Sequence, residues 1–328
     1  MNRSASLFAR VGLGTAEIGN LHRRLTEKEA QATLHAAWRD GIRLFDTAPG
    51  YGAGLSELRL GAFLRDCDRD LYVLSTKVGR VFSSELSATR SLFAAPLPFS
   101  ARFGYDYDSI MRAHEQSILR LGIAQIDMLL VHDLDHRNHG DDLDRHFRDL
   151  AESGVRAMTE LKRRGDVRMI GIAVNEGAIG TRMLAEGDWD VALLASRYTL
   201  LEQPALYDFL PTAAARNVRV VAGGIFNSGI LAGGSDSSTT YDYAPAAVGV
   251  RQRVKAIEAV CLRHGVPLAA AAMQFVLAHP GIEKILIGTS RQERIAEAAA
   301  LLSRVIPQAF WQDLRESGLV PAAAPMPG

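Results

Sequence analysis

Several features that would mark particular classes of protein are missing from this chain of 328 residues. Its 37 Lys and Arg residues balance its 37 Asp and Glu residues, so the formal net charge at pH 7 is zero. No electrostatic attraction therefore predicts nucleic acid or an anionic membrane as a partner. Cysteine is scarce: Cys67 and Cys261 are the only two, and neither belongs to a C-x-x-C pair. We expect no disulfide framework.

Long hydrophobic runs and phosphate-binding motifs are missing too. The longest apolar run, residues 266–278, is too short to span a bilayer and contains Gln274. Residues 1–11 hold Arg3 and Arg10 without the unbroken apolar stretch of a secretory signal. No G-x-G-x-x-G follows an early strand-like run, and no G-x-x-x-x-G-K-[ST] occurs. With 48% hydrophobic residues, enough for a large core, we expect a soluble, cytoplasmic globular protein.

Eight short aliphatic runs alternate along the chain with longer amphipathic patterns. The runs predict strands at residues 10–14, 43–46, 71–77, 127–132, 169–174, 191–196, 219–222 and 284–287. The amphipathic patterns predict helices at residues 26–40, 56–66, 108–121, 142–164, 176–185, 203–216, 247–264 and 292–302. Thr26 with Glu29 has the spacing of a capping box, and glycines such as Gly122 and Gly165 stand where helices should end.

Eight strand–helix units predict a (β/α)8 TIM barrel that occupies residues 1–328 as a single domain. A doubly wound sheet is the competing architecture, and the missing glycine fingerprint weakens it. Three connections are long: residues 79–107, 133–141 and 226–245. All three follow the carboxyl ends of predicted strands, the barrel face on which active sites lie.

Polar side chains end three consecutive predicted strands. Asp46 ends the second strand, Lys77 the third and His132 the fourth, and Tyr51 follows Asp46 in a Pro-Gly turn. Each alone has an ordinary structural explanation, such as a cap, a solvated charge or a packed ring. Neighbouring parallel strands lie about 4.8 Å apart, so together these side chains can meet over one barrel mouth.

The four residue types suit proton transfer to or from an oxygen atom. A phenol has an unperturbed pKa near 10, and a buried ammonium group close to Tyr51 would lower it. Lys77 would itself need a carboxylate partner such as Asp46. A neutral imidazole at His132 can orient a substrate oxygen. This chemistry requires neither a nucleophile nor a metal, and combined with hydride transfer it is carbonyl reduction or alcohol oxidation.

These segments resemble the aldo-keto reductase superfamily. Residues 45–52 (Phe-Asp-Thr-Ala-Pro-Gly-Tyr-Gly) are similar to its second-strand signature, and residues 75–77 and 131–132 are similar to its third and fourth. The resemblance implies that Asp46, Tyr51, Lys77 and His132 form the family's catalytic tetrad. It also implies that a nicotinamide nucleotide, NAD or NADP, is the hydride carrier.

The resemblance also implies a set of nucleotide-binding residues. They are Asp46, Asn175, Asn227, Ser228, Gly288, Thr289, Ser290, Arg291, Arg294 and Glu297. Val174 stands where the family usually has Ser, Ala195 where it usually has Gln, and residues 221–225 lack the tyrosine that stacks on the nicotinamide in many members. Gly288 replaces the lysine that binds the 2′-phosphate in many NADPH-preferring members, which favours NAD. Arg291 and Arg294 keep NADP open.

The long connections resemble one bacterial subgroup of this superfamily, through residues 94–99, 226–231 and 241–245. That subgroup contains D-threo-aldose (L-fucose) 1-dehydrogenases and a pyridoxal 4-dehydrogenase. The resemblance implies oxidation of an aldose hemiacetal to the lactone with Tyr51 as general acid and base. Pyridoxal oxidation and general carbonyl reduction are the alternatives. Arg80, Phe82 and Tyr241 are candidate substrate contacts.

Two hypotheses from other functional classes remain. A metal-dependent hydrolase would use acidic and histidine ligands, and several lie at residues 132–142, but they share one connection instead of spreading over strands. We therefore predict no metal. The other hypothesis is a nucleotide-binding regulatory subunit of a membrane channel with little turnover. Nothing in the sequence fixes the oligomeric state.

Overall fold

The computed structural model describes residues 8–86, 92–236 and 240–328. Residues 1–7 of the expected non-secretory N-terminus lie outside these ranges, as do parts of the long connections at 79–107 and 226–245. Cys67 and Cys261 are both unpaired thiols. Across the described ranges, no single helix is long and apolar enough to cross a membrane, although α11 (Val248–His264) and α12 (Leu268–Ala278) pass that test jointly as a pair bent by 101°.

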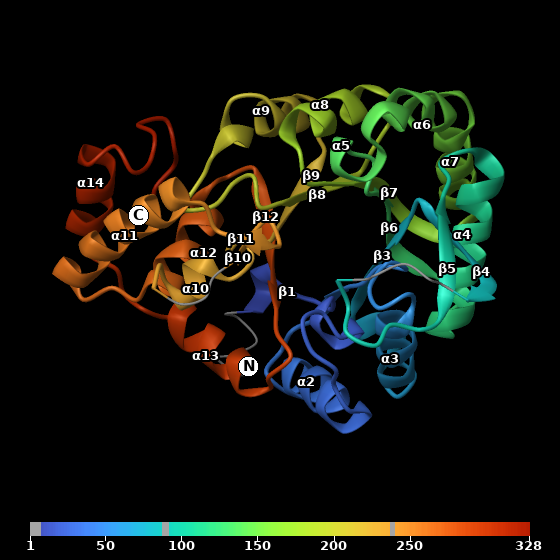
Figure 1. Cartoon of the computed structure of the whole chain (residues 1–328), viewed down its shortest axis with the longest axis horizontal. Helices are drawn as coiled ribbons and strands as arrows, with labels where there is room; N and C mark the ends of the chain where they lie inside the picture. The colour runs from blue at the N-terminus through green and yellow to red at the C-terminus, as the bar shows by residue number, and fades with distance from the viewer. Residues whose placement is uncertain (1–7, 87–91, 237–239) are drawn as a thin grey trace.

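Eight parallel strands close into a barrel in the order β1-β12-β9-β8-β7-β6-β3-β2. Figure 1 shows the helices arranged around this ring of strands. The predicted (β/α)8 barrel is confirmed, and the doubly wound sheet is wrong. The barrel strands are β1 (Val11–Gly14), β2 (Leu44–Asp46), β3 (Val73–Val78), β6 (Ile126–His132), β7 (Val167–Val174), β8 (Val191–Ala195), β9 (Arg219–Gly223) and β12 (Ile282–Gly288).

Most predicted helices are present within a few residues of their expected bounds. The helices are α2 (Glu27–Arg39), α3 (Leu55–Leu64), α4 (Tyr107–Leu121), α5 (His136–His139), α6 (Leu143–Asp149), α7 (Val155–Arg164), α8 (Gly177–Ala185), α9 (Phe209–Ala215), α10 (Ile230–Gly233), α11 (Val248–His264), α12 (Leu268–Ala278), α13 (Glu293–Leu302) and α14 (Gln308–Glu316). The capping box of α2 is confirmed, since Thr26 and Glu29 cap each other's backbone N–H groups.

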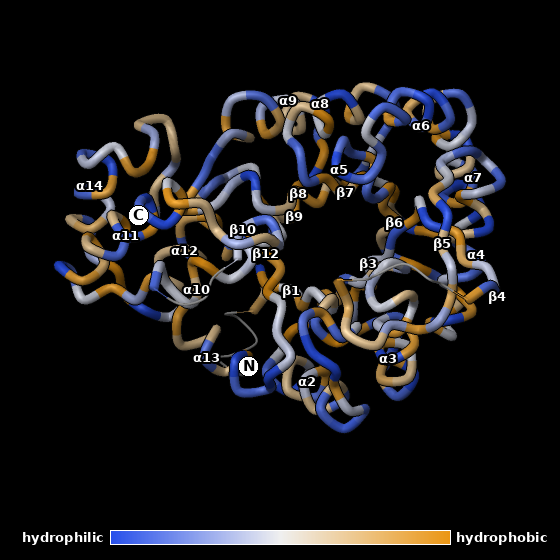
Figure 2. The backbone as a smooth tube through the Cα atoms, in the orientation of Figure 1, coloured by the Kyte–Doolittle hydropathy of each residue, from blue (hydrophilic) through white to orange (hydrophobic). Residues whose placement is uncertain are grey.

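The core has two parts. Inside the barrel, eight buried side chains from alternate positions of the strands pack together: Leu44, Met128, Leu130, Ala173, Val191, Leu193, Val221 and Leu286. A much larger cluster lies between the strands and the surrounding helices. The hydrophobic residues accordingly follow the strands and the inner faces of the helices in Figure 2. Strands covered on both faces explain the unbroken apolar runs in the sequence.

Several elements differ from those predicted, or were not predicted. The single helix expected at 142–164 is divided by a π-helical turn at Leu150–Gly154. The helix expected at 203–216 is a 3-10 turn, Pro204–Leu206, followed by α9. The apolar run at 266–278 forms the unpredicted helix α12, and α14 was also missed. The connection at 79–107 is not only loop, because β4 (Arg80–Leu86) and β5 (Phe99–Phe103) form a hairpin.

Candidate active site

Three predicted catalytic side chains extend from neighbouring strands at the carboxyl end of the barrel. Strand β2 pairs with β3, and Asp46 stands opposite Ser75. Strand β3 pairs with β6, and Lys77 stands opposite Leu130, two residues before His132. Tyr51 follows in the turn after β2, where its backbone N–H donates to the carbonyl of Ala48 at 3.1 Å. The topology therefore brings the four predicted residues to one mouth.

Asp46 and Lys77 form a buried ion pair. The Lys77 Nζ atom lies 2.8 Å from Asp46 Oδ2 and donates to the carbonyl oxygen of Thr47 at 2.6 Å. The other carboxylate oxygen of Asp46 accepts from the Ser75 hydroxyl at 2.7 Å. The side chains of Lys77 and Asp46 are only 1% and 3% exposed. A charged pair this deep is tolerable because every charged atom has hydrogen-bonding partners.

Tyr51 lies between this pair and His132. The Lys77 Nζ atom is 4.9 Å from the centroid of the Tyr51 ring. The imidazole of His132 is perpendicular to the same ring, with 6.3 Å between ring centroids. Phe93 packs against the phenol ring from another direction at 6.1 Å. The phenol, the ammonium group and the imidazole are thus close enough to act on one substrate oxygen.

The expected lowering of the Tyr51 pKa by Lys77 is not what the structure gives. Burial, followed by the negative charge of Asp46 and the nearby Tyr243 and Asp133, raises the pKa of Tyr51 well above 10. The physical reason is first that burial penalises the charged phenolate, and second that the negative charge of Asp46 repels it. Tyr51 is therefore protonated at neutral pH and is suited to donating a proton to an alkoxide.

His132 is held as a neutral imidazole. Burial, together with the positive charges of Lys77 and Arg80, lowers its pKa to about 4 against the partly opposing effect of Asp133. Its backbone carbonyl accepts a hydrogen bond from the Tyr105 hydroxyl at 2.9 Å. A neutral ring so positioned matches the predicted role of orienting a substrate oxygen.

Asp133 is a residue of the site that sequence reasoning missed. Its Oδ1 atom is 3.2 Å from His132 Nε2, and its Oδ2 atom accepts from Arg80 Nη2 at 2.7 Å and Arg80 Nε at 3.1 Å. Sequence reasoning considered Asp133 only as part of a metal-binding loop. The available signal was its position, one residue beyond a strand-end histidine. Arg80 was predicted to contact substrate, and it does lie at the mouth.

Asn175, the residue expected to bind the carboxamide of the nucleotide, lies just beyond β7. Its side-chain amide N–H donates to Asp135 Oδ2 at 3.3 Å. Its backbone carbonyl accepts from Arg197 Nε at 2.5 Å. Arg197 also forms ion pairs with Glu202 at 3.0 Å and Asp242 at 2.8 Å. The backbone of Asn175 is therefore attached to the connections that follow β8 and β9.

Asn227 and Ser228 lie in the long connection that follows β9. The buried amide of Asn227 donates to Glu202 Oε1 at 2.8 Å and to the Ser196 carbonyl at 3.3 Å. In the described part of the chain, its Oδ1 atom is buried with no hydrogen-bonding partner. The Ser228 hydroxyl accepts from the backbone N–H of Tyr243 at 3.2 Å. Ser228 thus shapes the loop in this structure.

The remaining predicted nucleotide-binding residues surround the start of α13. Gly288 ends β12, and the hydroxyl of Thr289 accepts from the backbone N–H of Arg291 at 3.0 Å, which forms a turn before the helix. Ser290 is half-buried and Arg291 is exposed. Arg294 and Glu297 pair with each other at 3.0 Å, and both are about half exposed.

The two other predicted substrate contacts, Phe82 and Tyr241, have protein partners in this structure. The backbone of Phe82 bonds to Gln116, and Arg120 lies over its ring at 5.3 Å, so Phe82 packs against α4. The Tyr241 hydroxyl donates to Glu202 Oε1 at 2.8 Å and belongs to the Arg197 network. Among residues 8–86, 92–236 and 240–328, no group of three or more His, Cys, Asp or Glu side chains is arranged to hold a metal ion.

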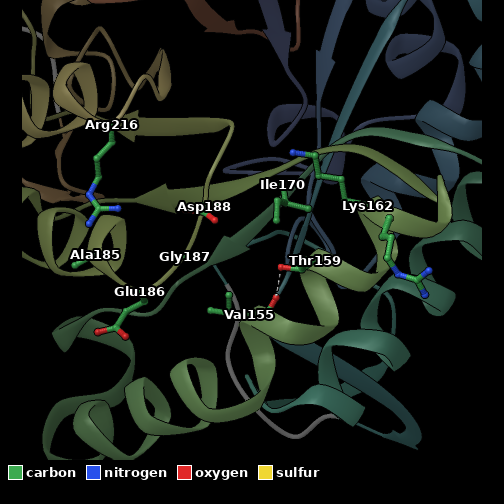
Figure 3. Close-up of a pocket in the computed structure, with 10 residues that line it drawn as sticks. Val155, Thr159, Lys162, Ile170, Ala185, Glu186, Gly187, Asp188 and Arg216 are labelled. Atoms are coloured by element: carbon green, nitrogen blue, oxygen red, sulfur yellow. Dashed lines mark hydrogen bonds between the residues drawn. The ribbon is translucent and has the colours of Figure 1, made fainter.

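The open pocket drawn in Figure 3 is on the opposite end of the barrel. It has a volume of about 740 Å³ and is lined by residues that precede strands, among them Lys162 and Arg163 before β7, Asp188 before β8 and Arg216 before β9. The amino-terminal face of such barrels contributes to stability, and catalysis takes place at the other face. This pocket is therefore not the active site.

A family model confirms what the geometry indicates. Residues 10–318 match the model described as the aldo/keto reductase family. The chain belongs to this family. The resemblance noted in the sequence is thereby confirmed, and the protein is an NAD(P)-dependent oxidoreductase that acts on a small molecule.

Curated relatives align over almost the whole chain. The pyridoxal 4-dehydrogenase of Microbacterium luteolum is 40% identical over 333 residues, covering 98% of this chain and 97% of that protein. The D-threo-aldose 1-dehydrogenase of Pseudomonas sp is 38% identical over 319 residues, covering 95% and 94%. Among solved structures, the glycerol dehydrogenase of Gluconobacter oxydans has a TM-score of 0.74 at 21% identity, covering 97% of this chain and 93% of that one. The last comparison supports the fold alone.

Proposed function

We propose that the protein oxidises the anomeric hydroxyl of an aldose hemiacetal, of the L-fucose or D-threo-aldose type, and produces the lactone. The observation that carries this proposal is the group formed by Tyr51, the Asp46–Lys77 pair and neutral His132 at one barrel mouth. The similarity to a D-threo-aldose 1-dehydrogenase supports the choice of substrate.

In the proposed reaction, the substrate hydroxyl lies between Tyr51 and His132. The C1–H bond breaks and its electron pair leaves as hydride, while the hydroxyl proton moves to the Tyr51 oxygen and the C1=O bond forms. His132 orients the oxygen by hydrogen bonding. Lys77, held by Asp46, favours the transient phenolate electrostatically. The nucleotide would supply the hydride acceptor when bound.

We propose NAD over NADP as the hydride acceptor. Asn175 and Asn227 would hold the nicotinamide end, and the buried, unpartnered Oδ1 atom of Asn227 fits a donor such as an amide or a ribose hydroxyl. Residues 288–291 would hold the phosphates with the backbone N–H groups at the start of α13. Gly288 offers no positive charge to bind the 2′-phosphate of NADP. Arg291 and Arg294 are near enough in sequence to provide such a charge.

Pyridoxal 4-dehydrogenase activity is the second candidate, because a relative with that name is 40% identical to this chain. General carbonyl reduction is the third, and the raised pKa of Tyr51 favours proton donation. A regulatory nucleotide-binding subunit remains the candidate of another class.

We also propose that the chain acts as one domain, since α14 packs back on α11 through a 2.7 Å contact of His264 with Asp313. A cytoplasmic location accords with two unpaired thiols.

The test is the appearance of reduced nicotinamide absorbance with NAD or NADP and a panel of L-fucose, D-arabinose and pyridoxal. We expect growth of the signal with an aldose and NAD. Growth with pyridoxal alone would replace the aldose proposal with the second candidate. Tight nucleotide binding with no turnover on any alcohol or carbonyl would favour the regulatory subunit.

A further inference from the structure

A charged carboxylate lies beside the catalytic imidazole, and proton transfer does not need it. Asp133 Oδ1 is 3.2 Å from His132 Nε2. The tetrad already provides a proton donor, a compensated ammonium group and an orienting ring. Asp133 is nevertheless close enough to Tyr51 and His132 to influence both electrostatically. Its position next to the imidazole that would orient the reacting oxygen points to a role toward the substrate itself.

The backbone of Asp133 is fixed in an uncommon conformation. Its φ is +58°, in the left-handed region that a non-glycine residue seldom adopts. Its carbonyl lies 2.9 Å from His139 Nε2, and the same nitrogen is 3.0 Å from the Tyr105 hydroxyl. Such a conformation persists where surrounding contacts determine it, which is common at functional sites.

Arg80 binds one oxygen of the carboxylate, Oδ2, and leaves the other, Oδ1, beside His132 Nε2. The guanidinium group donates twice to Asp133 Oδ2 and stacks on the Phe103 ring with its Cζ atom 4.2 Å from the centroid. Burial alone would raise the pKa of Asp133, but His132, Arg80 and Lys77 together hold it below its usual value. The carboxylate is thus ionised, and Oδ1 retains a lone pair beyond its contact with His132.

We infer that Asp133 Oδ1, supported by Arg80, accepts a hydrogen bond from a hydroxyl group on the carbon next to the reacting carbon. This inference rests on the proposed function and deepens it. With the reacting oxygen held by Tyr51 and His132, a vicinal hydroxyl oxygen lies about 3 Å from it, which matches the reach of an acceptor beside His132 Nε2. Asp133 is then a specificity-determining residue that selects 2-hydroxy substrates, as sugars are.

The inference predicts that the protein prefers substrates with a hydroxyl group next to the reacting carbon, and that this preference is lost when the Asp133 carboxylate is removed. We would measure kcat/KM for L-fucose against 2-deoxy-L-fucose in oxidation, and for glycolaldehyde against acetaldehyde in reduction. The second pair tests the inference in the reverse direction. In the unmodified protein the hydroxyl-bearing member should be favoured by about 10- to 100-fold, as expected for a hydrogen bond to a charged group.

Two variants separate recognition from folding. Asp133→Gly suits the positive φ and removes the carboxylate, and Asp133→Asn is isosteric, uncharged and also tolerated in that conformation. We expect Asp133→Gly to reduce the preference to within about threefold and Asp133→Asn to be intermediate. Because the preference is a ratio of two kcat/KM values, a loss of activity shared by both members of a pair cancels from it. Asp141→Asn, an exposed acid of the same connection, is the control and should keep the full preference.

Two results would overturn the inference. One is an unmodified protein that shows no preference for the hydroxyl-bearing member of either pair. The other is an equal loss on both members of each pair in Asp133→Gly, since that would assign Asp133 only to the support of His132. A protein that oxidises no aldose yet prefers glycolaldehyde through Asp133 would reject the proposed function and retain this inference.

Discussion

At the scale of single residues, the site depends on buried charges that are compensated in pairs. Lys77 is neutralised by Asp46, and Arg80 by Asp133. Removing one member of such a pair leaves an uncompensated buried charge, which is far more costly than losing a surface ion pair. His132 differs because it is buried beside these pairs and is held neutral. Its protonation is therefore linked to the stability of the fold.

This linkage predicts the direction in which stability changes with pH. The pKa of His132 is lowered from 6.5 to about 4 in the folded protein. The unfolded chain therefore binds more protons between these values, and the stability from neutral His132 is present above pH 6.5 and is lost as the pH falls toward 4. We therefore expect the unmodified protein to be more stable than His132→Asn above pH 6.5 and to lose this difference in the free energy of unfolding as the pH falls toward 4.

Urea unfolding of both proteins at several pH values measures this difference. Glu17, whose pKa burial raises to about 7, changes stability in the opposite direction: its contribution is present below about pH 4.5 and is lost as the pH rises through 7. Glu17 is present in both proteins, so its effect cancels. A stability difference that stays constant from pH 7.5 to about pH 4.5 would contradict the proposed state of His132.

At the scale of elements, close approaches between backbones set the geometry of the barrel. Gly171 in β7 is the clearest case, because a Cβ atom there would come within 1.9 Å of the Val191 carbonyl oxygen in β8. Gly249, in α11, is the opposite case, since a Cβ atom there would meet nothing within 4 Å. The two glycines therefore provide a matched pair.

We predict that Gly171→Ala destabilises the fold and that Gly249→Ala does not. The first change forces β7 and β8 apart, and overpacking of this kind costs roughly 1–3 kcal/mol or more. The second replaces an exposed helical glycine and should be neutral or stabilising by up to about 1 kcal/mol. Thermal unfolding followed by circular dichroism compares them. Equal melting temperatures for the two variants would show that the β7–β8 approach is not a constraint.

A second element-scale feature is the network around Arg197, which joins β7 to the connections after β8 and β9. Arg197 contacts the Asn175 carbonyl and pairs with Glu202 and Asp242. Since Asn175 is expected to hold the nicotinamide end, we predict that Arg197→Ala raises the Kd for the nucleotide roughly tenfold. Loss of an anchor that positions a binding residue, with two carboxylates left unpaired, is the physical reason.

Titration of protein fluorescence with nucleotide measures this Kd. Arg182→Ala is the matched control, because Arg182 pairs with Asp144 on the surface, where the two side chains are 46% and 72% exposed. That pair should contribute little, so the control should bind nucleotide normally. Equal affinities in the two variants would limit the role of Arg197 to its own loop.

At the scale of the whole molecule, the sequence predicted what local patterns encode. Aliphatic runs that alternate with amphipathic patterns placed all eight barrel strands, and the strand-end positions of Asp46, Lys77 and His132 placed them at one face. Long-range contacts were not predictable in this way. The π-helical turn at Leu150–Gly154 ends at Gly154, which closely approaches the Tyr105 carbonyl of another element. The raised pKa of Tyr51 depends first on its burial in the folded chain and then on charged groups that include the distant Tyr243.

The β4–β5 hairpin was missed for a similar reason. Its strands are exposed on most positions, so they lack the apolar pattern that marks a core strand. The partnership of Asp133 with Arg80 also spans two connections that only the closed barrel brings together. Sequence patterns thus identified the four candidate catalytic residues, and the fold was needed to show which charges surround them.

The most direct test of the account is a comparison of Tyr51→Phe with the unmodified protein, in both nucleotide binding and turnover of L-fucose. We predict that the variant binds nucleotide with an unchanged Kd and loses turnover by about 10²- to 10⁴-fold, the usual contribution of a general acid–base group. The phenyl ring preserves the packing against Phe93 and His132 and removes only the hydroxyl. Turnover close to that of the unmodified protein would contradict the role assigned to Tyr51 and, with it, the proposed active site.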